Sequence, residues 1–321
     1  MGLPVLGLTL PQFNERPRPA LEACRDAWTL GFGGVFVFDH LWPLGQPERP
    51  ALEGWTLLAA LAAQVGREGS GEPQRGAPVG QAPEGFRVGT LVTRAGLRNP
   101  GLVARMAATV AEIAGGPPII GIGRGDAANR DENQAFGLPF GDPAERTAAL
   151  EATVAALRRP LAGSRSTGAP PWGSPDPSGP EVWVGGTGPS ALALAGRLGD
   201  AWNGWGRTPE ELAAGLAGAR RAAEAAGRDP AAVAGTWAGQ VLVAADGREA
   251  EDRLAAWGAD RPPAEVARVL AGDPGAVVAR LRALADAGAS WCVLAPVGGP
   301  GAEARALLAE AAGLPGCIGN S

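Results

Sequence analysis

The feature that most constrains the fold of this chain is the regular alternation of short apolar runs with longer amphipathic segments. The runs predicted as strands are residues 5–10, 34–38, 86–92, 119–122, 181–184, 201–203, 236–244 and 291–295. Strands that lack polar alternation are typical of a parallel sheet that helices cover. Eight β-then-α units in 321 residues predict an α/β protein that forms a closed (β/α)8 TIM barrel, rather than an open doubly wound sheet.

Two stretches interrupt this alternation. Residues 66–85 and 163–180 are rich in Gly, Pro, Gln and Ser and have no apolar period. The alternation continues across each stretch, so we interpret both as loop insertions in a single domain that spans residues 1–321. Residues 313–321 are predicted to be a C-terminal tail.

Composition and charge exclude several classes of function. The 28 basic and 33 acidic residues give a net charge of -5, and there is no Arg-rich block, which argues against nucleic-acid binding. No apolar run reaches the ~18 residues of a membrane-spanning helix. The first residues lack the charged and apolar regions of a signal peptide. We therefore expect a cytoplasmic protein without a membrane segment.

The rare residue types narrow the chemistry further. The three cysteines, Cys24, Cys292 and Cys317, form no paired motif, and His40 is the single histidine, so no metal site is expected. The sequence contains no lysine, which excludes Schiff-base chemistry and a P-loop lysine.

The most informative polar pair is Asp39-His40, directly after the second predicted strand. Active sites of barrels lie at the C-terminal ends of the strands, where a histidine can act as an acid, a base or a hydrogen-bond donor. A neighbouring carboxylate can fix the histidine tautomer or raise its pKa. The alternative is a lone histidine that is satisfied within a loop.

Glycine-rich turns follow the fourth and fifth predicted strands. The first glycine-rich turn, Gly185-Gly186-Thr187-Gly188, joins a strand to a helix. Its glycines either let the backbone approach a bound phosphate or are needed only for the geometry of a tight turn. The run from Gly121 to Asp126 has the wrong glycine spacing for a dinucleotide fingerprint. We interpret it as a place where a flat ring meets the backbone, with Asp126 projecting into the site. Asp126 and Asp246 follow the fourth and seventh predicted strands and could form the carboxylate pair of a glycosidase, but no other sequence feature supports that function.

Taken in order, these strand-end motifs resemble the bacterial luciferase-like superfamily of flavin- and deazaflavin-dependent oxidoreductases. The similar segments are residues 30–40, Val88-Gly89-Thr90-Leu91-Val92-Thr93, Arg98-Asn99-Pro100, Gly121-Ile122-Gly123-Arg124-Gly125-Asp126, residues 132–139, Val182-Trp183-Val184-Gly185-Gly186 and Gly199-Asp200-Ala201-Trp202-Asn203. The resemblance extends from about residue 6 to residue 294.

The resemblance implies a barrel that holds a flavin-type ring in its mouth. It places Asp39 and His40 against the ring and the substrate, with His40 as proton donor or acceptor. It also places Asp126 at the position where some members use a glutamate as the catalytic acid. Leu91-Val92 matches a bulge behind the ring that often contains a non-proline cis bond. The residues implied to bind the cofactor are Asp39, Leu91, Val92, Thr93, Arg124, Gly125, Asn129, Gly185, Gly186, Trp205 and Gly206.

Two cofactor branches remain open. The Asp-His pair and the Gly-Ile-Gly-Arg-Gly-Asp segment favour coenzyme F420 and hydride transfer, and the alternative is an FMN-dependent monooxygenase. Because no lysine is present to bind a substrate phosphate, a neutral or apolar small-molecule substrate is expected, with Phe13 and Trp42 as candidate pocket residues. The resemblance also implies a homodimer and a partner enzyme that reduces the cofactor. A barrel that binds a ligand without turnover is a third hypothesis.

Overall fold

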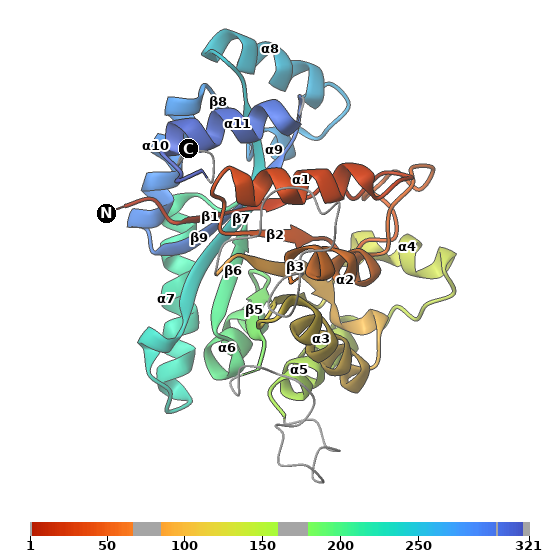
Figure 1. Ribbon diagram of the computed structural model, residues 1–321. Helices are drawn as coiled ribbons and strands as arrows, with labels where there is room; N and C mark the ends of the chain where they lie inside the picture. Colours follow the sequence, from red (N-terminus) through yellow and green to blue (C-terminus); the bar gives the residue numbers. More distant parts are fainter. Residues whose placement is uncertain (1, 67–84, 160–178, 300, 317–321) are drawn as a thin grey trace, which may run out of the picture.

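The computed structural model describes residues 2–66, 85–159, 179–299 and 301–316, and these residues build a ring of parallel strands (Figure 1). The strands are β1 (Val5–Thr9), β2 (Gly34–Val37), β3 (Arg87–Arg94), β4 (Ile119–Gly123), β5 (Glu181–Gly185), β6 (Ala201–Trp205), β7 (Ala234–Val243), β8 (Leu270–Gly272) and β9 (Ala289–Pro296). The strands from β1 to β7 pair in chain order, β7 pairs with β9, and β9 pairs with β1. The predicted closed (β/α)8 barrel is therefore confirmed.

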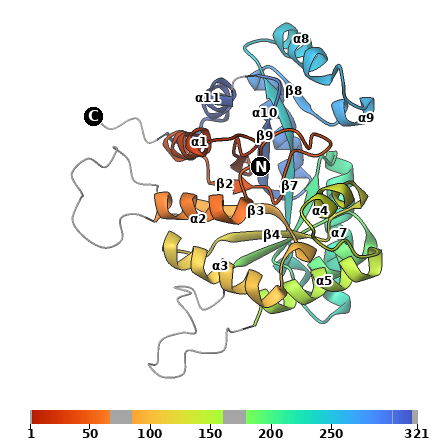
Figure 2. The ribbon, with the colours of Figure 1, turned by 90° about the vertical axis from the view of Figure 1, so that its right-hand side faces the viewer.

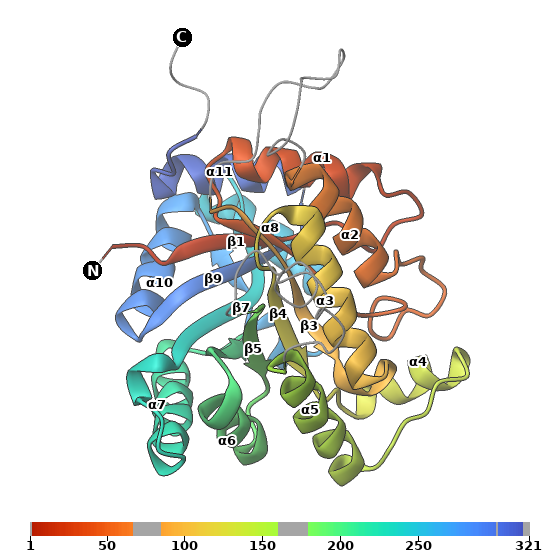
Figure 3. The ribbon, with the colours of Figure 1, turned by 60° about the horizontal axis from the view of Figure 1, so that its bottom comes forward.

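Helices surround this ring, as Figure 3 shows. They are α1 (Arg18–Thr29), α2 (Gly54–Val65), α3 (Pro100–Ala114), α5 (Pro143–Leu157), α6 (Pro189–Leu198), α7 (Pro209–Ala225), α10 (Pro274–Asp286) and α11 (Gly301–Ala312). Many begin with a proline in the first turn behind a polar capping residue, such as Asn99, Asp142, Thr208 and Asp273. These residues accept hydrogen bonds from backbone N–H groups that would otherwise lack partners, and so they fix where each helix begins.

The lower part of the barrel interior is filled by aromatic side chains. Phe36 stacks on Trp183 with ring centroids 5.4 Å apart, and Trp291 contacts both rings. Glycines on the neighbouring strands leave room for this plug, since a Cβ atom on Gly7 or Gly89 would come within 3 Å of the Phe36 ring. Because the plug closes the interior, a ligand has to approach from the C-terminal ends of the strands.

One strand was not predicted. The sequence suggested only helical segments between the seventh and eighth predicted strands, but the three-residue strand β8 pairs there with Val241–Val243 of β7, outside the ring. With α8 (Gly247–Gly258) and α9 (Pro263–Val266) it forms a small lobe (Figure 2). The lobe has its own apolar cluster around Leu242, Ala250 and Val269. Three residues are too few to show a strand period, which is why the pattern missed β8.

Strand β3 runs to Arg94, two residues beyond the predicted end, and it contains the expected irregularity. Its pairing with β4 shifts register between Thr90 and Thr93, and the Leu91–Val92 peptide bond is cis. The Val92 side chain fills space over the ends of β4 and β5, because Cβ atoms on Gly123 and Gly185 would lie 2.9 and 3.1 Å from it. The absence of side chains at Gly123 and Gly185 therefore makes room for the β3 bulge.

The predicted loop insertions at 66–85 and 163–180 lie almost entirely outside the described residues, as do residues 317–321 of the predicted tail. Within the described part of the chain, no helix is both long enough and apolar enough to cross a bilayer.

We predict that Gly89→Ala lowers the free energy of unfolding by about 1–3 kcal/mol, because the added methyl group meets the Ile119 carbonyl oxygen at 2.4 Å as well as the Phe36 ring. Gly247→Ala is the matched control, since a Cβ atom there has open space. Urea denaturation measures both, and equal stabilities of the two variants would contradict the packing argument.

Candidate active site

The polar and aromatic residues that the sequence singled out gather at the C-terminal rim, beginning with the segment after β2. The fully buried side-chain amide of Gln12 extends the pairing of β1 with β2 beyond the ends of these strands. Its Oε1 accepts from the Phe38 N–H and its Nε2 donates to the Phe38 carbonyl, both at 2.8 Å. Nε2 also donates to the Leu52 carbonyl at 2.8 Å. Gln12 thereby fixes the backbone that presents Phe38, Asp39 and His40.

Phe38 is the centre of an aromatic wall. Phe13 stacks on it with centroids 5.9 Å apart, and Trp205, at the end of β6, meets it edge-on at 6.0 Å. The His40 ring lies 6.4 Å from the Phe38 ring. Trp205 is 42% exposed, which is unusual for so large an apolar side chain. The structure thus brings together the predicted residues Phe13, His40 and Trp205 around a phenylalanine that was not predicted.

Trp42, the other predicted substrate residue, belongs to a different contact. Its ring lies 5.6 Å from that of Phe136, which follows the short helix α4 (Arg130–Ala135) and is 53% exposed. Trp42 and Phe136 therefore join the segment after β2 to α4.

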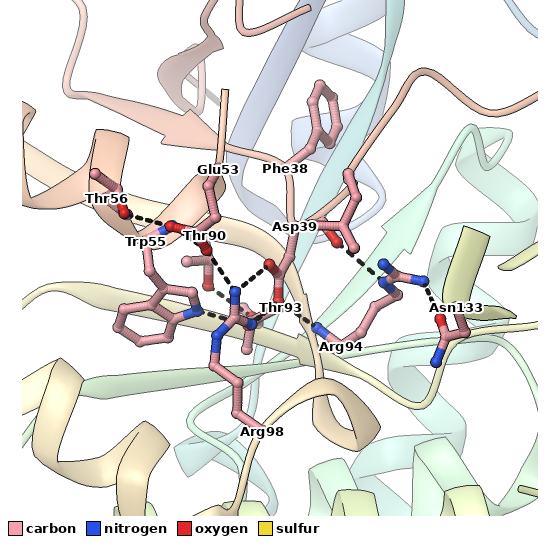
Figure 4. Close-up of polar contacts among 12 residues, drawn as sticks. Phe38, Asp39, Glu53, Trp55, Thr56, Thr90, Thr93, Arg94, Arg98 and Asn133 are labelled. Atoms are coloured by element: carbon pink, nitrogen blue, oxygen red, sulfur yellow. Dashed lines mark hydrogen bonds and ion pairs between the residues drawn. The ribbon is translucent and has the colours of Figure 1, made fainter. Parts of the chain in front are cut away.

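Asp39 is only 1% exposed, and its carboxylate is saturated with donors (Figure 4). Oδ2 accepts from the Thr93 hydroxyl at 2.5 Å, from the Arg94 N–H at 3.1 Å and from Arg98 Nη1 at 2.7 Å. Oδ1 accepts from Arg98 Nη2 at 3.0 Å. These contacts occupy the Asp39 carboxylate and anchor the segment after β2 to the end of β3.

Arg98 also joins this anchor to α2. Its Nη2 donates to Glu53 at 2.5 Å, and Glu53 caps α2 by accepting from the N–H groups of Trp55 and Thr56. Burial lowers the pKa of Arg98, but the carboxylates of Asp39 and Glu53 outweigh burial and raise it. Arg98 therefore remains a cation between two carboxylates.

His40 has a buried carboxylate as its partner. His40 Nδ1 lies 3.3 Å from Oε2 of Glu132 in α4, and the Glu132 side chain is fully buried. The Leu41 N–H donates to Oε1 of Glu132, and Arg94 Nη1 lies 3.0 Å from Oε2. Arg94 also donates from Nε to the Asp39 carbonyl at 3.0 Å. Arg94 therefore contacts both Asp39 and the carboxylate that holds His40.

The residues after β4 lie beside this network. Arg124 donates to the Thr147 hydroxyl of α5 at 3.2 Å. The exposed Asp126 caps a short 3-10 turn at Ala127–Asn129, and the buried Asn129 accepts from its N–H. A cleft of about 450 Å³ is lined by residues of this segment, of β3, of α4 and of α5, among them Arg94, Arg124, Asn133, Phe140 and Arg146. Asp126 is thus at the rim, where it serves as a helix cap.

The turn after β5 places Gly185 and Gly186 beside α6. Gly186 has φ of +126°, and its carbonyl accepts from Trp202 Nε1 at 2.7 Å. The capping residue of α6, Gly188, has no side chain to accept from the first turn. After β6, Gly206 has φ of +60°, and its carbonyl accepts from Arg268 at 2.8 Å. The backbone donors at the start of α6 therefore face no capping side chain.

Sequence reasoning missed Gln12, Phe38, Glu53, Arg94, Arg98 and Glu132 as members of the site. Phe38, Arg98 and Glu132 do occur in the segments that carry the family resemblance, and this occurrence could have marked them as candidates. Nothing in the sequence pairs Gln12 with Phe38 or His40 with Glu132, which lies 92 residues away. Among the described residues, no three His, Cys, Asp or Glu side chains gather closely enough to hold a metal ion.

We predict that Arg98→Met lowers the free energy of unfolding by about 3–5 kcal/mol, because it leaves the buried Asp39 carboxylate without its cation. Arg18→Met is the control, since Arg18 pairs with Glu22 on an exposed helix surface, where loss of the ion pair should leave the free energy of unfolding nearly unchanged. Urea denaturation of both variants tests this, and a loss at Arg98 no larger than that at Arg18 would refute it.

Comparison with known proteins identifies the family of the chain. A family model described as luciferase-like monooxygenase matches residues 77–290. The phthiodiolone/phenolphthiodiolone dimycocerosates ketoreductase of Mycobacterium kansasii is 32% identical over 212 residues, which cover 63% of this chain and 52% of that protein. The F420-dependent glucose-6-phosphate dehydrogenase of Beutenbergia cavernae is 33% identical over 196 residues, which cover 57% of this chain and 51% of that protein. The chain thus spans about half the length of these curated relatives.

A solved structure shares the whole fold. The F420-dependent secondary alcohol dehydrogenase in complex with an F420-acetone adduct superposes with a TM-score of 0.72 at 19% identity, over 97% of this chain and 98% of that one. The family model covers more than half of the chain and includes the ends of β3 to β7. The chain belongs to the luciferase-like monooxygenase family.

Proposed function

We propose that the protein is an F420-dependent oxidoreductase that interconverts the alcohol and carbonyl forms of a small neutral or apolar substrate. The observation that carries this proposal is the position of His40, the single histidine of the chain, on a partly exposed rim beside the aromatic wall of Phe13, Phe38 and Trp205. The names of the ketoreductase, the glucose-6-phosphate dehydrogenase and the secondary alcohol dehydrogenase support the reaction class.

The residues at the rim fit a phosphorylated tricyclic cofactor. The bulge at Leu91, Val92 and Thr93 offers a wall for the ring. The start of α6, after Gly185 and Gly186, has no capping side chain. Because Pro189 has no N–H and the Ala191 N–H donates to the Gly188 carbonyl, the Ser190 N–H is the first-turn donor that would bind a phosphate. In this proposal Arg124, Gly125 and Asn129 contact polar edges of the cofactor, and Trp205 and Gly206 complete its site. Bound F420 would supply the carbon that takes or gives the hydride.

The chain itself orients the substrate and moves the proton. His40 gives a proton to the substrate oxygen or takes one from it, and Phe13 and Trp42 supply apolar surface that keeps water from the reacting carbon. We assign Asp39 a positioning role, because Arg98 and its other donors occupy its carboxylate. Asp126 contributes a negative charge at the rim.

An FMN-dependent monooxygenase is the second candidate, because the matching family model is described as luciferase-like monooxygenase. Both candidates use the same rim, so cofactor preference separates them.

We predict that F420 binds at least about tenfold more tightly than FMN, as measured by quenching of protein fluorescence in parallel titrations. The reverse preference would support the monooxygenase. Failure of both cofactors to bind would contradict both proposals and favour a barrel that binds another ligand without turnover.

We also predict that His40→Ala lowers turnover by about 10²–10⁴-fold while the Kd for F420 changes less than about threefold, because the proton transfer is lost and the cofactor contacts remain. The assay follows the absorbance of oxidised F420 with a secondary alcohol as substrate. Added imidazole should restore part of the rate in His40→Ala. Unchanged turnover would remove His40 from the mechanism.

A further inference from the structure

Apart from the His40 ring, the described groups that contact the buried carboxylate of Glu132 are all donors. Besides His40 Nδ1, the Leu41 N–H, Arg94 Nη1 and the Asn129 side-chain amide at 3.4 Å all point to its two oxygens. Burial raises the pKa of Glu132, but the hydrogen bonds from His40 and Leu41 and the charge of Arg94 outweigh burial, so the pKa is lowered. Glu132 is therefore ionised at neutral pH, and an ionised carboxylate can only accept hydrogen bonds.

This arrangement decides which nitrogen of His40 carries the proton. Because Glu132 can only accept, Nδ1 must donate to it, and a neutral imidazole then has an unprotonated Nε2. No described residue forms a hydrogen bond with Nε2, and the His40 side chain is 22% exposed at the rim. Nε2 is thus the ring nitrogen available to a ligand.

The surrounding charges keep Glu132 in place. Arg94, which is 6% exposed, is the cation next to it, and it is itself held by the Asp39 carbonyl and by Asn133 Oδ1 at 2.9 Å. The Asp39 carboxylate is paired with Arg98 and does not compete for His40. Among the described residues that contact His40, Glu132 is therefore the one acceptor for Nδ1.

The geometry points to Glu132 as a positioning residue that holds neutral His40 in the Nδ1–H tautomer, so that Nε2 accepts the hydroxyl proton of an alcohol substrate. This inference rests on the proposed function. In the oxidation direction, the substrate O–H bond breaks and its proton goes to Nε2, while the C–H bond gives its electron pair and hydrogen to the cofactor as hydride and the C=O bond forms. In the reverse direction, Nε2–H returns the proton to the oxygen as hydride reaches carbon. Glu132 also stabilises the imidazolium that exists between these events.

The single histidine makes this tautomer directly observable. In 15N-labelled protein without cofactor, at about pH 9, where a histidine is normally neutral, all imidazole signals come from His40. Couplings to the two carbon-bound ring protons distinguish Nδ1 from Nε2, and the nitrogen shift shows which one is protonated. We expect protonated Nδ1 and unprotonated Nε2. A proton on Nε2 in the wild-type chain overturns the inference, whether or not any variant folds.

The kinetic test compares Glu132→Gln with a control variant, Glu181→Gln. The control removes the carboxylate that pairs with Arg87 at the opposite end of the barrel. We expect Glu132→Gln to populate the Nε2–H tautomer and to lower kcat at least about tenfold, with KM and the Kd for F420 changed less than about threefold. Glu181→Gln should leave the tautomer and kcat unchanged. An unchanged kcat in Glu132→Gln overturns the inference. Failure of F420 to bind would instead contradict the proposed function, even if the nitrogen shifts show that His40 carries its proton on Nδ1.

Discussion

The buried ion pair between Asp39 and Arg98 is the interaction on which the rest of the rim depends. A carboxylate that is 1% exposed is tolerated only when its charge is compensated and its oxygens are hydrogen-bonded. Arg98, Thr93 and the Arg94 N–H meet both conditions, and Glu53 extends the network to the start of α2. The segment that carries His40 is therefore tied to the end of the neighbouring strand β3 and to the start of its own helix α2, rather than held by its own backbone alone.

Arg94 couples this anchor to the part of the rim that carries His40 and Glu132. Its backbone N–H contacts the Asp39 carboxylate, its Nε contacts the Asp39 carbonyl, and its Nη1 reaches Glu132 and Asn133. The backbone of β3 can bring Arg94 to this position because the strand bulges at residues 90–93 and then continues. Burial lowers the pKa of Arg94 even though carboxylates lie nearby, which reflects how completely the guanidinium is removed from water.

The barrel could be predicted from the sequence because eight buried strands leave a strong apolar pattern, and Asp39 and His40 could be placed at the rim because each follows such a strand. Their partners could not be predicted. Glu132 contacts His40, and Gln12 contacts Phe38, although each pair is far apart in the sequence. No spacing rule connects residues that meet only through tertiary packing. The glycines after β4 were recognised, but their packing around Val92 depends on a register shift that periodicity does not reveal.

A guanidinium of the lobe formed by α8, α9 and β8 contacts the backbone at the C-terminal end of β6. Arg268, just before β8, donates to the carbonyl of Gly206, the residue that follows Trp205. A homologue with a shorter connection between β7 and α10 would lose this donor and would need another way to satisfy that carbonyl. A change in the position of this peripheral lobe is consequently transmitted through Arg268 to the backbone after β6, although the lobe contributes no strand to the closed ring.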